Sequence, residues 1–351
     1  MPRPRKIGVL TFHKCINYGS YWQARCLVEG LRAKGFDAEL LDHHCSGVEQ
    51  AELRCALQPH LPDRTAKRHL KHYSAKVRAF HSAFRRLPLS RRFDLHRPPD
   101  AGRYDAIVVG SDEVWNFRHP WYGSKPIFFG EDLPAERVLS YGASFGNHSA
   151  WDGIHPDWAA KLAGFSALSV RDENSVHLVR NGLGENPKLV LDPCLLFPHV
   201  AKAEANAHEE FAVVYGHGFP EWLQHSVRDW AERRGVTLVS IGYANEWADE
   251  QRIGAGPLEF ARMMSAAQAV VTNFFHGCVF ALLNGKPWIA APSAYRAIKI
   301  PDLARLLGVE DRLITEVTPP EQLHELLGTG GQASLDDLRG RSEAYLDAAL
   351  A

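Results

Sequence analysis

The stretch VVTNFFHGCVFALLNGKPWIAAP, from Val270 to Pro292, gives the clearest indication of how this chain folds. An apolar run ends at Thr272-Asn273, a short polar link carries His276, and Gly277 opens a second apolar run. A turn at Gly285-Lys286-Pro287 then leads into a third apolar run. This order predicts a strand, a loop, a helix, a turn and a second strand. It is the pattern expected of a parallel α/β sheet.

His276 would lie just beyond the carboxyl end of the first of these strands. Open α/β sheets bind ligands at that edge, and the first amides of a helix favour anions there. A histidine beside a glycine at such a junction can also be a capping or core residue, and the chain contains 18 histidines. We take His276 as a candidate catalytic residue and the Gly277 amide as a candidate ligand contact.

The N-terminal region repeats this organisation. Residues Ile7 to Thr11 read as a strand, Tyr21 to Lys34 as a helix, and Phe36 to Leu41 as a second strand. The intervening loop would place polar groups at the helix N-terminus, where an anion is favoured; they belong to Asn17, Gly19 and Ser20. Neither GxGxxG nor GxxxxGK[ST] occurs in this loop, so it carries no nucleotide-binding motif.

Two further predicted strands bring polar residues to the same edge. The strand Tyr104 to Val109 delivers Ser111 and Asp112, and a strand at Val138 to Tyr141 is followed by the small-residue loop GASFG. Asp112 could serve as a general base or a hydrogen-bond anchor for a sugar hydroxyl, or simply cap the turn.

Arg171 follows the short predicted strand from Leu168. Its planar guanidinium suits a phosphate or carboxylate, and the alternative is a surface ion pair with an acid such as Asp172.

The chain is long enough for two domains. It has 351 residues, of which 45% are hydrophobic and 23% charged, as in ordinary globular proteins. A second α/β pattern begins at a predicted strand, Phe211 to Tyr215. We predict an N-terminal domain over 1–197, a linker over 198–209 and a C-terminal domain over 210–351 that includes a helical tail.

A basic segment interrupts the first domain at about residues 54–97. It contains twelve Lys or Arg against two acids, Asp63 and Asp94, with apolar residues at helical spacing. One interpretation is a helical insertion with a solvated basic face. The other is a face that meets anionic lipid headgroups or an anionic carrier such as a polyprenyl diphosphate. Nucleic acid is disfavoured because no recognised binding module accompanies the charge.

Composition and the cysteine pattern indicate in which cellular compartment we expect the protein. The net charge is −1, so the whole molecule does not steer toward polyanions. The six cysteines form no CxxC pair, which indicates reduced thiols. The N-terminal sequence passes directly into a strand, and no run of 18 apolar residues occurs. We therefore expect a cytoplasmic protein, with contact at the inner face of the membrane if the basic face meets lipid.

Five blocks, in order along most of the chain, resemble the polysaccharide pyruvyl transferase family. They are IGVLTFHKCINYGSYWQARCL, YDAIVVGSDEVWN, LSYGASFG, SVRDENS with LVLDPCLLF, and VTNFFHGCVFALLNGKP with YRAIKIPDLARLLGVEDRL. The resemblance implies an α/β fold with two Rossmann-like domains facing across a cleft, as in the GT-B fold. It also implies transfer of pyruvate from phosphoenolpyruvate to a sugar as a cyclic ketal, with release of phosphate.

The same resemblance implies roles for individual residues. Arg171 matches the SxRD arginine expected to hold the donor, and His276 matches the HG histidine expected in acid–base catalysis. Some members carry Arg where this chain has Phe274, and the TxxFHG form is a branch of the family. Arg296 and Lys299, in the YRxxK segment, are then the candidate donor-binding cations.

The candidate site therefore has three sets of residues. The catalytic candidates are His276 and Asp112. The donor-binding candidates are Arg171, Arg296, Lys299, Asn17, Gly19, Ser20 and Gly277. The acceptor-binding candidates are Ser111, Trp115, Asn116 and Ser144. We expect no metal, because His43-His44-Cys45 lacks complete ligand spacing, and no cofactor beyond phosphoenolpyruvate as co-substrate. The expected partners are a sugar or lipid-linked glycan acceptor and an anionic membrane surface, without nucleic acid.

Two other functions fit parts of the pattern. A GT-B glycosyltransferase would use a nucleotide sugar, but retaining enzymes usually place a Glu on the helix where this chain has Ala281, Leu282 and Leu283. A non-catalytic member would bind a glycan or an anionic metabolite.

Overall fold

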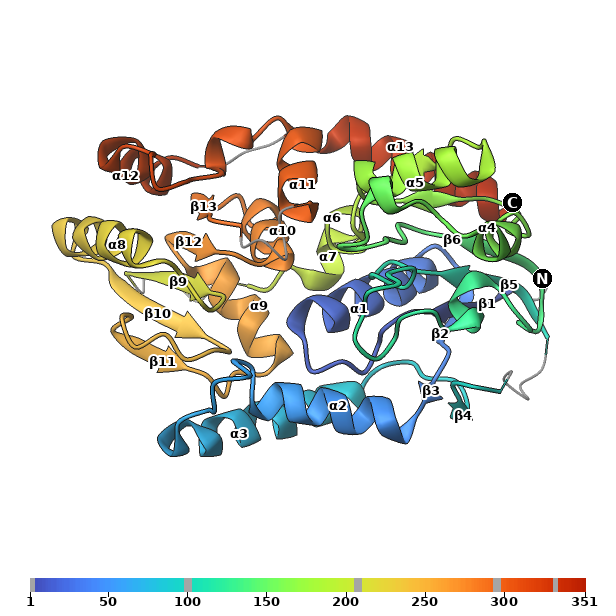
Figure 1. Cartoon of the computed structure of the whole chain (residues 1–351), viewed down its shortest axis with the longest axis horizontal. Helices are drawn as coiled ribbons and strands as arrows, with labels where there is room; N and C mark the ends of the chain where they lie inside the picture. Colours follow the sequence, from blue (N-terminus) through green and yellow to red (C-terminus); the bar gives the residue numbers. More distant parts are fainter. Residues whose placement is uncertain (1–3, 98–102, 205–209, 293–297, 331–333) are drawn as a thin grey trace. The chain divides into compact units, whose positions relative to one another are not determined.

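The computed structural model describes residues 4–97, 103–204, 210–292, 298–330 and 334–351. The chain forms two compact units, whose elements are labelled in Figure 1. The first unit consists of Met1–Glu52, Arg86–Val200 and Leu335–Ala351, and the second of Leu53–Arg85 and Ala201–Ser334. Each unit is built on one parallel sheet.

The sheet of the first unit has four parallel strands in the order β2-β1-β5-β6. They are β1 (Lys6–Leu10), β2 (Asp37–Leu40), β5 (Tyr104–Val109) and β6 (Ala135–Ser140). Helix α1 (Tyr18–Ala33) connects β1 to β2. The direction of winding reverses beside β1, because β2 lies on one side of it and β5 on the other. Ligands of open α/β sheets bind at the carboxyl ends of the strands beside such a reversal.

Shorter elements extend this unit. A two-stranded sheet pairs β3 (His43–His44) with β4 (Phe93–Asp94), and another pairs β7 (Ser169–Val170) with β8 (Lys188–Leu189). The parallel bridge between Ala143 and Val170 brings the end of β7 beside the chain that leaves β6. Besides α1, this unit includes the helices α2 (Ser46–Leu57, its first part), α4 (Pro156–Leu162), α5 (Glu173–Leu183), α6 (Pro193–Leu196) and α13 (Asp336–Leu350).

The sheet of the second unit has five parallel strands in the order β11-β10-β9-β12-β13. They are β9 (Phe211–Tyr215), β10 (Thr237–Ile241), β11 (Glu250–Arg252), β12 (Ala269–Thr272) and β13 (Trp288–Ala290). The winding reverses between β9 and β12, so their carboxyl ends are where a ligand is expected. The helices are α3 (Lys67–Phe84), α8 (Glu221–Arg234), α9 (Pro257–Ala266), α10 (Phe275–Leu283), α11 (Lys299–Leu307) and α12 (Pro320–Gly328).

The central strands β9 and β12 of the second sheet are short runs of mostly apolar residues. All five residues of β9 and all four of β12 are buried. Such runs are typical of parallel strands under helices on both sides. The predicted strand, loop, helix, turn and strand over 270–292 therefore appear as β12, α10 and β13.

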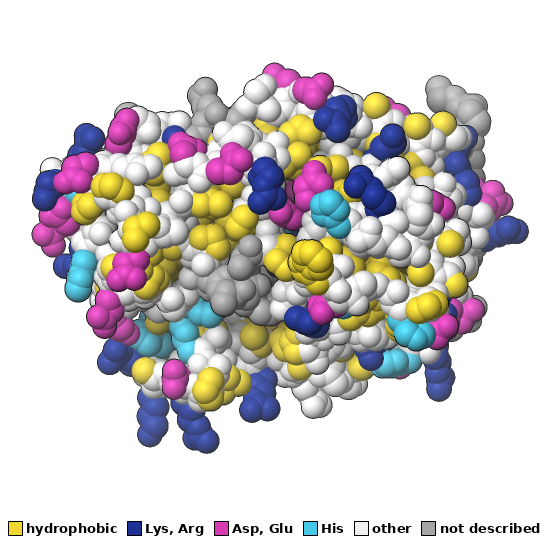
Figure 2. Space-filling view, turned by 45° about the horizontal axis from the view of Figure 1, so that its top comes forward, with side chains coloured by type: hydrophobic (Ala, Val, Ile, Leu, Met, Phe, Trp, Pro, Cys, Tyr) yellow, Lys and Arg dark blue, Asp and Glu magenta, His cyan; other side chains and the backbone are white. Residues whose placement is uncertain are grey.

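The predicted domain boundaries are wrong for the basic segment. Residues 53–85 group with the second unit, although the sequence places the segment in the first domain. The apolar face of α3 packs against α9, because Gly254 and Gly256 let the chain before α9 approach closely. A methyl group added at Gly256 would lie 2.9 Å from Cβ of Ala79. Figure 2 shows Lys and Arg side chains projecting from the lower edge of the view, along which α3 runs in Figure 1.

The predicted position of the C-terminal tail is also wrong. Helix α13 belongs to the first unit rather than to the C-terminal domain. Its Ser342 hydroxyl accepts a hydrogen bond from the amide of Leu191 at 2.9 Å, and the Tyr345 hydroxyl donates to the carbonyl of Ser140 at 2.7 Å. The predicted linker 198–209 begins with a short helix, α7 (Pro198–Ala201), and its residues 205–209 lie outside the described residues.

Among the helices that the structure describes, none has the length and apolar character needed to cross a membrane.

Candidate functional site

His276 lies at the carboxyl end of β12, beside the reversal of the second sheet. Helix α10 begins at the residue before it, and the side chain is buried. The Thr272 hydroxyl donates to the carbonyl of Tyr215 at 2.6 Å and accepts from the amide of Phe274 at 3.0 Å. These bonds tie the end of β12 to the end of β9. His276 is therefore fixed where the topology predicts a ligand.

Gly277 allows helix α10 to approach the strand before it. A methyl group added at Gly277 would lie 2.1 Å from Oγ1 of Thr272. The Gly277 amide donates to the carbonyl of Phe274 at 2.9 Å. This amide is therefore already used within the turn, and its contact with a ligand stays a prediction. The glycine is needed for close packing.

Of the two predicted second-domain cations, the structure describes one. Lys299 is the first residue of α11, its side chain is buried, and α11 packs against α10. Lys299 thus lies on a helix adjacent to the one that carries His276. Arg296 lies outside the described residues.

Arg171 is buried in the first unit between two carboxylates. One Nη donates to the carbonyl of Ser111 and, at 2.8 Å, to Oδ2 of Asp192, and the other lies 3.4 Å from Oδ1 of Asp112. Burial alone would lower the pKa of Arg171, but the two carboxylates outweigh it and raise that pKa. The alternative of an ion pair with an acid is correct for Arg171, but the pair is buried rather than at the surface and its partners are Asp112 and Asp192. Asp172 caps α5 instead.

Ser111 and Asp112 follow the carboxyl end of β5, as predicted. Asp112 accepts a hydrogen bond from the Glu113 amide at 2.8 Å through Oδ1. Its Oδ2 and the Ser111 hydroxyl are buried, with no hydrogen-bond partner among the residues that the structure describes. Burying a polar atom without a partner costs free energy. A hydroxyl group of a ligand would supply the missing partner for Asp112.

The predicted anion site at the start of α1 is occupied by the chain itself. Oδ1 of Asn17 accepts from the amides of Gly19 at 2.8 Å and Ser20 at 3.3 Å. This is an ordinary N-cap, which satisfies the donors that an anion would use. Donor binding by these three residues stays a prediction, and it would require the bonds to Asn17 to be replaced.

Three predicted acceptor contacts belong to the packing of the first unit. Trp115 is fully buried, and its indole N–H donates to the carbonyl of Phe128 at 2.8 Å. Asn116 donates to Glu113 and Asn147, and the Ser144 hydroxyl accepts from the Gly146 amide at 2.9 Å. The three side chains are buried and hold neighbouring loops, and their contact with an acceptor stays a prediction.

A comparison of this sequence with known protein families identifies the family to which the chain belongs. Residues 17–293, more than half of the chain, match the family described as polysaccharide pyruvyl transferase. The chain belongs to this family. The matched range contains His276, Arg171 and Asp112. A comparison with curated proteins found no match. Membership makes this pyruvyl transferase family protein a transferase that acts on polysaccharide, with a sugar or glycan as acceptor.

Solved structures confirm the fold class of this pyruvyl transferase family member. A UDP-N-acetylglucosamine 2-epimerase from Listeria monocytogenes is 11% identical, with a TM-score of 0.53, and the match covers 98% of this chain and 95% of that one. Another UDP-N-acetylglucosamine 2-epimerase is 13% identical, with a TM-score of 0.50 and coverage of 98% and 91%. At these identities the likeness shows the fold alone, which is α/β and GT-B-like with two Rossmann-like domains.

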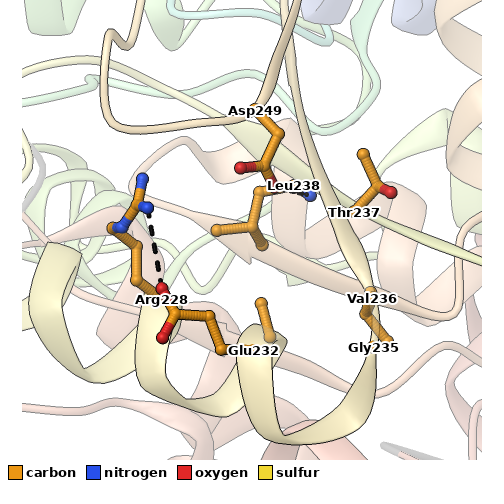
Figure 3. Close-up of a pocket in the computed structure, with 8 residues that line it drawn as sticks. Arg228, Glu232, Gly235, Val236, Thr237, Leu238 and Asp249 are labelled. Atoms are coloured by element: carbon orange, nitrogen blue, oxygen red, sulfur yellow. Dashed lines mark hydrogen bonds and ion pairs between the residues drawn. The ribbon is translucent and has the colours of Figure 1, made fainter.

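A pocket of about 170 Å³ lies at the opposite end of β10 from this edge (Figure 3). Its charged groups are engaged within the protein: Arg228 pairs with Glu232 at 3.6 Å, and Asp249 accepts from the Leu238 amide at 2.8 Å. Because Val236, Thr237 and Leu238 line it, the pocket lies at the amino end of β10, away from the edge where His276 lies.

The fold buries polar groups that the sequence pattern did not single out. Lys76 was included in a basic helical face, yet it is only 2% exposed and its ammonium donates to the carbonyl of Gly242 at 3.0 Å. Its spacing from Tyr73 and Phe80 places it on the apolar side of α3, which is the signal that could have identified it.

His13, which is also buried, lies 3.0 Å from Asp42. The hydrogen bonds from His13 and Lys14 outweigh burial and lower the pKa of Asp42 to about 2.

Proposed function

We propose that the protein transfers pyruvate from phosphoenolpyruvate to a sugar of a polysaccharide or glycan precursor, forming a cyclic ketal and releasing phosphate. The observation that carries the proposal is the buried His276 at the carboxyl end of β12, inside the region that matches the family. An imidazole can change its charge near neutral pH. It can therefore act as an acid in one step and as a base in another.

The reaction needs one proton delivered and two removed. A proton adds to the methylene carbon of phosphoenolpyruvate, which leaves an oxocarbenium-like centre at the neighbouring carbon. One sugar hydroxyl attacks that carbon and loses its proton, and the carbon–oxygen bond to phosphate breaks. The second hydroxyl then closes the ring and loses its proton. One of the two protons balances the proton taken up by the methylene carbon, and the other is released.

We assign the acid–base role to His276 and the orientation of an acceptor hydroxyl to Asp112. The buried Oδ2 of Asp112 supports this role, because a hydroxyl donor would satisfy it. Arg171 was predicted to hold the donor, but its charge is already balanced by Asp112 and Asp192. A positioning role for Arg171, holding Asp112 in place, fits these contacts better.

For the donor we propose contact with Lys299, because phosphoenolpyruvate carries both a phosphate and a carboxylate. Arg296 remains a predicted second cation. The proposal needs no bound cofactor or metal ion, since phosphoenolpyruvate enters as a co-substrate. The acceptor is proposed to be a sugar on a glycan or a lipid-linked precursor.

We also propose that a cytoplasmic protein of this kind touches an anionic membrane through helix α3. The helix has no acidic residue. Its outward face carries Lys67, Lys71 and Arg78, followed by Arg85 on the same stripe, and all four are exposed. The opposite face is buried, so contact would be electrostatic and without insertion. Each basic residue near an anionic bilayer contributes about 1 kcal/mol.

Calorimetric titration with phosphoenolpyruvate, compared with a panel of nucleotide sugars, tests the proposed donor. We expect phosphoenolpyruvate to bind and nucleotide sugars not to bind. His276→Ala should keep this binding and lose at least about a hundredfold in phosphate release with glycan acceptors. His225→Ala, an exposed histidine of the same unit, is the matched control. Binding of a nucleotide sugar alone would replace the donor and make the protein a glycosyltransferase.

A further inference from the structure

Trp151 is the most exposed large apolar residue in the part of the chain that the structure describes. It is 98% exposed, whereas every other tryptophan of the chain is buried or half-buried. An indole gains free energy when it is buried against apolar groups, so a fully exposed one forgoes that gain. Exposed apolar surface of this kind is a mark of binding sites when it is held in a fixed position.

The backbone that carries Trp151 is held firmly. The residue lies in the short 3-10 helix η2 (Ala150–Asp152), which a capping box opens. In that box the hydroxyl of Ser149 accepts from the Trp151 amide at 3.3 Å. The amide of Ala150 donates to the side chain of Asn174 on α5 at 2.8 Å. The turn is therefore fixed from within and from α5, while the ring of Trp151 extends into solvent.

The turn belongs to the edge of the first sheet that carries Asp112. It follows the carboxyl end of β6, which pairs with β5, and β5 delivers Asp112. Hydrogen bonds join the loop after β5 to the loop after β6, and they run from Asp112 with Ser144 at 3.1 Å, through Asn116 with Asn147 at 3.0 Å, to Arg118 with Asp152 at 2.8 Å. One connected structure thus holds Asp112 at one end and the neighbour of Trp151 at the other.

The length of this structure suits an extended ligand. Arg118 follows Asp112 by six residues, and a chain advances by at most about 3.6 Å per residue, so their Cα atoms lie within about 22 Å of each other. Arg118 contacts the residue next to Trp151. A short stretch of a polymer can span such a distance, whereas a single sugar at Asp112 cannot.

The surroundings of Trp151 favour an uncharged partner. Between Phe145 and Pro156, Asp152 is the one Asp, Glu, Lys or Arg in the sequence, and its charge is balanced by Arg118. The turn therefore offers no net charge to a polyanion or an anionic membrane. It presents a single ring beside polar groups such as Ser149, whereas a protein interface is centred on a larger apolar patch.

A glycan fits these features. The face of an aromatic ring is negative, and it attracts the C–H groups on one face of a sugar ring. The hydroxyls at the edge of the sugar can then bond to neighbouring polar side chains. The family acts on polysaccharide. When one sugar of a polymer is at the reacting position, the rest of the polymer has to lie over the surface of the protein.

We propose that Trp151 is a stacking platform for a sugar of the glycan acceptor, away from the sugar that receives pyruvate. The inference rests on the proposed function, because it takes Asp112 as the residue that orients the reacting hydroxyl. The platform gives the protein affinity for long acceptors. It takes no part in donor binding, for which the proposed contact, Lys299, belongs to the second unit.

The test is affinity electrophoresis of the full-length protein in native gels that contain galactan, mannan, xylan or dextran. We expect at least one of these soluble polysaccharides to retard wild-type protein. Trp151→Ala should weaken that binding about two- to twelvefold, as expected for loss of one aromatic contact. Trp151→Tyr keeps an aromatic ring and should retain most of the binding. Val317→Ala is the control for loss of exposed apolar surface, because Val317 is 88% exposed in the second unit, and it should bind as wild-type protein does.

Calorimetric titration of the same variants with phosphoenolpyruvate separates this inference from the proposed function. If Trp151→Ala is retarded as strongly as wild-type protein, or if none of the polysaccharides retards wild-type protein, the platform is overturned, and binding of phosphoenolpyruvate would still support the proposed donor. If retardation depends on Trp151 but phosphoenolpyruvate does not bind, the platform stands and the proposed donor is rejected. If Trp151→Ala loses binding to phosphatidylcholine vesicles while its binding to polysaccharide is unchanged, the ring contacts a membrane and the platform is overturned.

Discussion

Replacing Lys76 with methionine should stabilise the protein at neutral pH, and the gain should shrink as the pH rises. The pKa of Lys76 is lowered from 10.5 to about 7 because its ammonium is buried. One pKa unit corresponds to about 1.4 kcal/mol. The charged form therefore costs the folded state about 4 kcal/mol at pH 7.

The direction of this pH dependence follows from how many protons each state binds. Well below pH 7 Lys76 is protonated in both states, so the folded state buries the whole charge; at pH 7 the unfolded chain is still protonated, whereas the folded state is about half protonated. Above pH 7 the folded state loses the proton while the unfolded state keeps it until about pH 10.5. Stability rises with pH wherever the unfolded state binds more protons. Between pH 7 and pH 9, wild-type protein should gain about 2 kcal/mol relative to Lys76→Met.

The absolute gain from methionine is smaller than the cost of the charge. The variant also loses the hydrogen bond to the carbonyl of Gly242, and leaving that group unsatisfied costs about 1–3 kcal/mol. The expected net stabilisation at pH 7 is therefore about 1–3 kcal/mol. The lost hydrogen bond affects the variant equally at both pH values. The change in the stability difference between pH 7 and pH 9 therefore does not depend on it, and this change is the better quantity to measure.

Urea denaturation of wild-type protein, Lys76→Met and Lys202→Met at pH 7 and pH 9 gives both quantities. Lys202→Met is the matched control, because Lys202 is exposed in the same unit, and it should follow wild-type protein at both pH values. The reasoning is refuted if Lys76→Met is less stable than wild-type protein at pH 7, or if the difference in stability is the same at pH 9. Either result would mean that the buried ammonium of Lys76 does not lower the free energy of unfolding.

Three further outcomes are expected. Arg171→Met should lower the free energy of unfolding by about 3–5 kcal/mol, because Asp112 and Asp192 would be left as uncompensated buried carboxylates; a loss below about 1 kcal/mol by urea denaturation would contradict the charge balance described here. Gly277→Ala should lower the free energy of unfolding by about 1–3 kcal/mol or more, because the added methyl group would clash with Thr272. In the same thermal melts, Gly340→Ala should be neutral or stabilising, because a methyl group there meets no described atom within 4 Å. Reversing Lys67, Lys71 and Arg78 to Glu should release the protein from anionic vesicles in sedimentation, whereas unchanged binding would reject the membrane contact.

The sequence by itself determined the order of the elements and the position of His276 along them. Apolar runs and glycine-bearing turns are local signals, and they predicted β12, α10 and β13 around His276. They also placed Ser111 and Asp112 at the carboxyl end of β5. Chain order alone therefore brings the polar residues of each unit to one edge of its sheet.

Only the tertiary structure decided which polar groups are already used within the protein. Arg171 donates to the carbonyl of a residue 60 positions away, and Lys76 to one 166 positions away. No local pattern reports such partners, because they depend on how distant segments pack. For this reason Trp115, which the sequence offered as an acceptor contact, is part of the core.

The same reason explains the wrong domain boundaries. The helical spacing of apolar residues predicted a buried face on α3 but not the helix that covers it. That face packs against α9, which follows it by more than 170 residues and belongs to the second unit. A hydrophobic stripe is non-directional and can be buried against any complementary surface. The sequence therefore determined that α3 is amphipathic, and packing decided which unit it joins and that Lys76 is buried there.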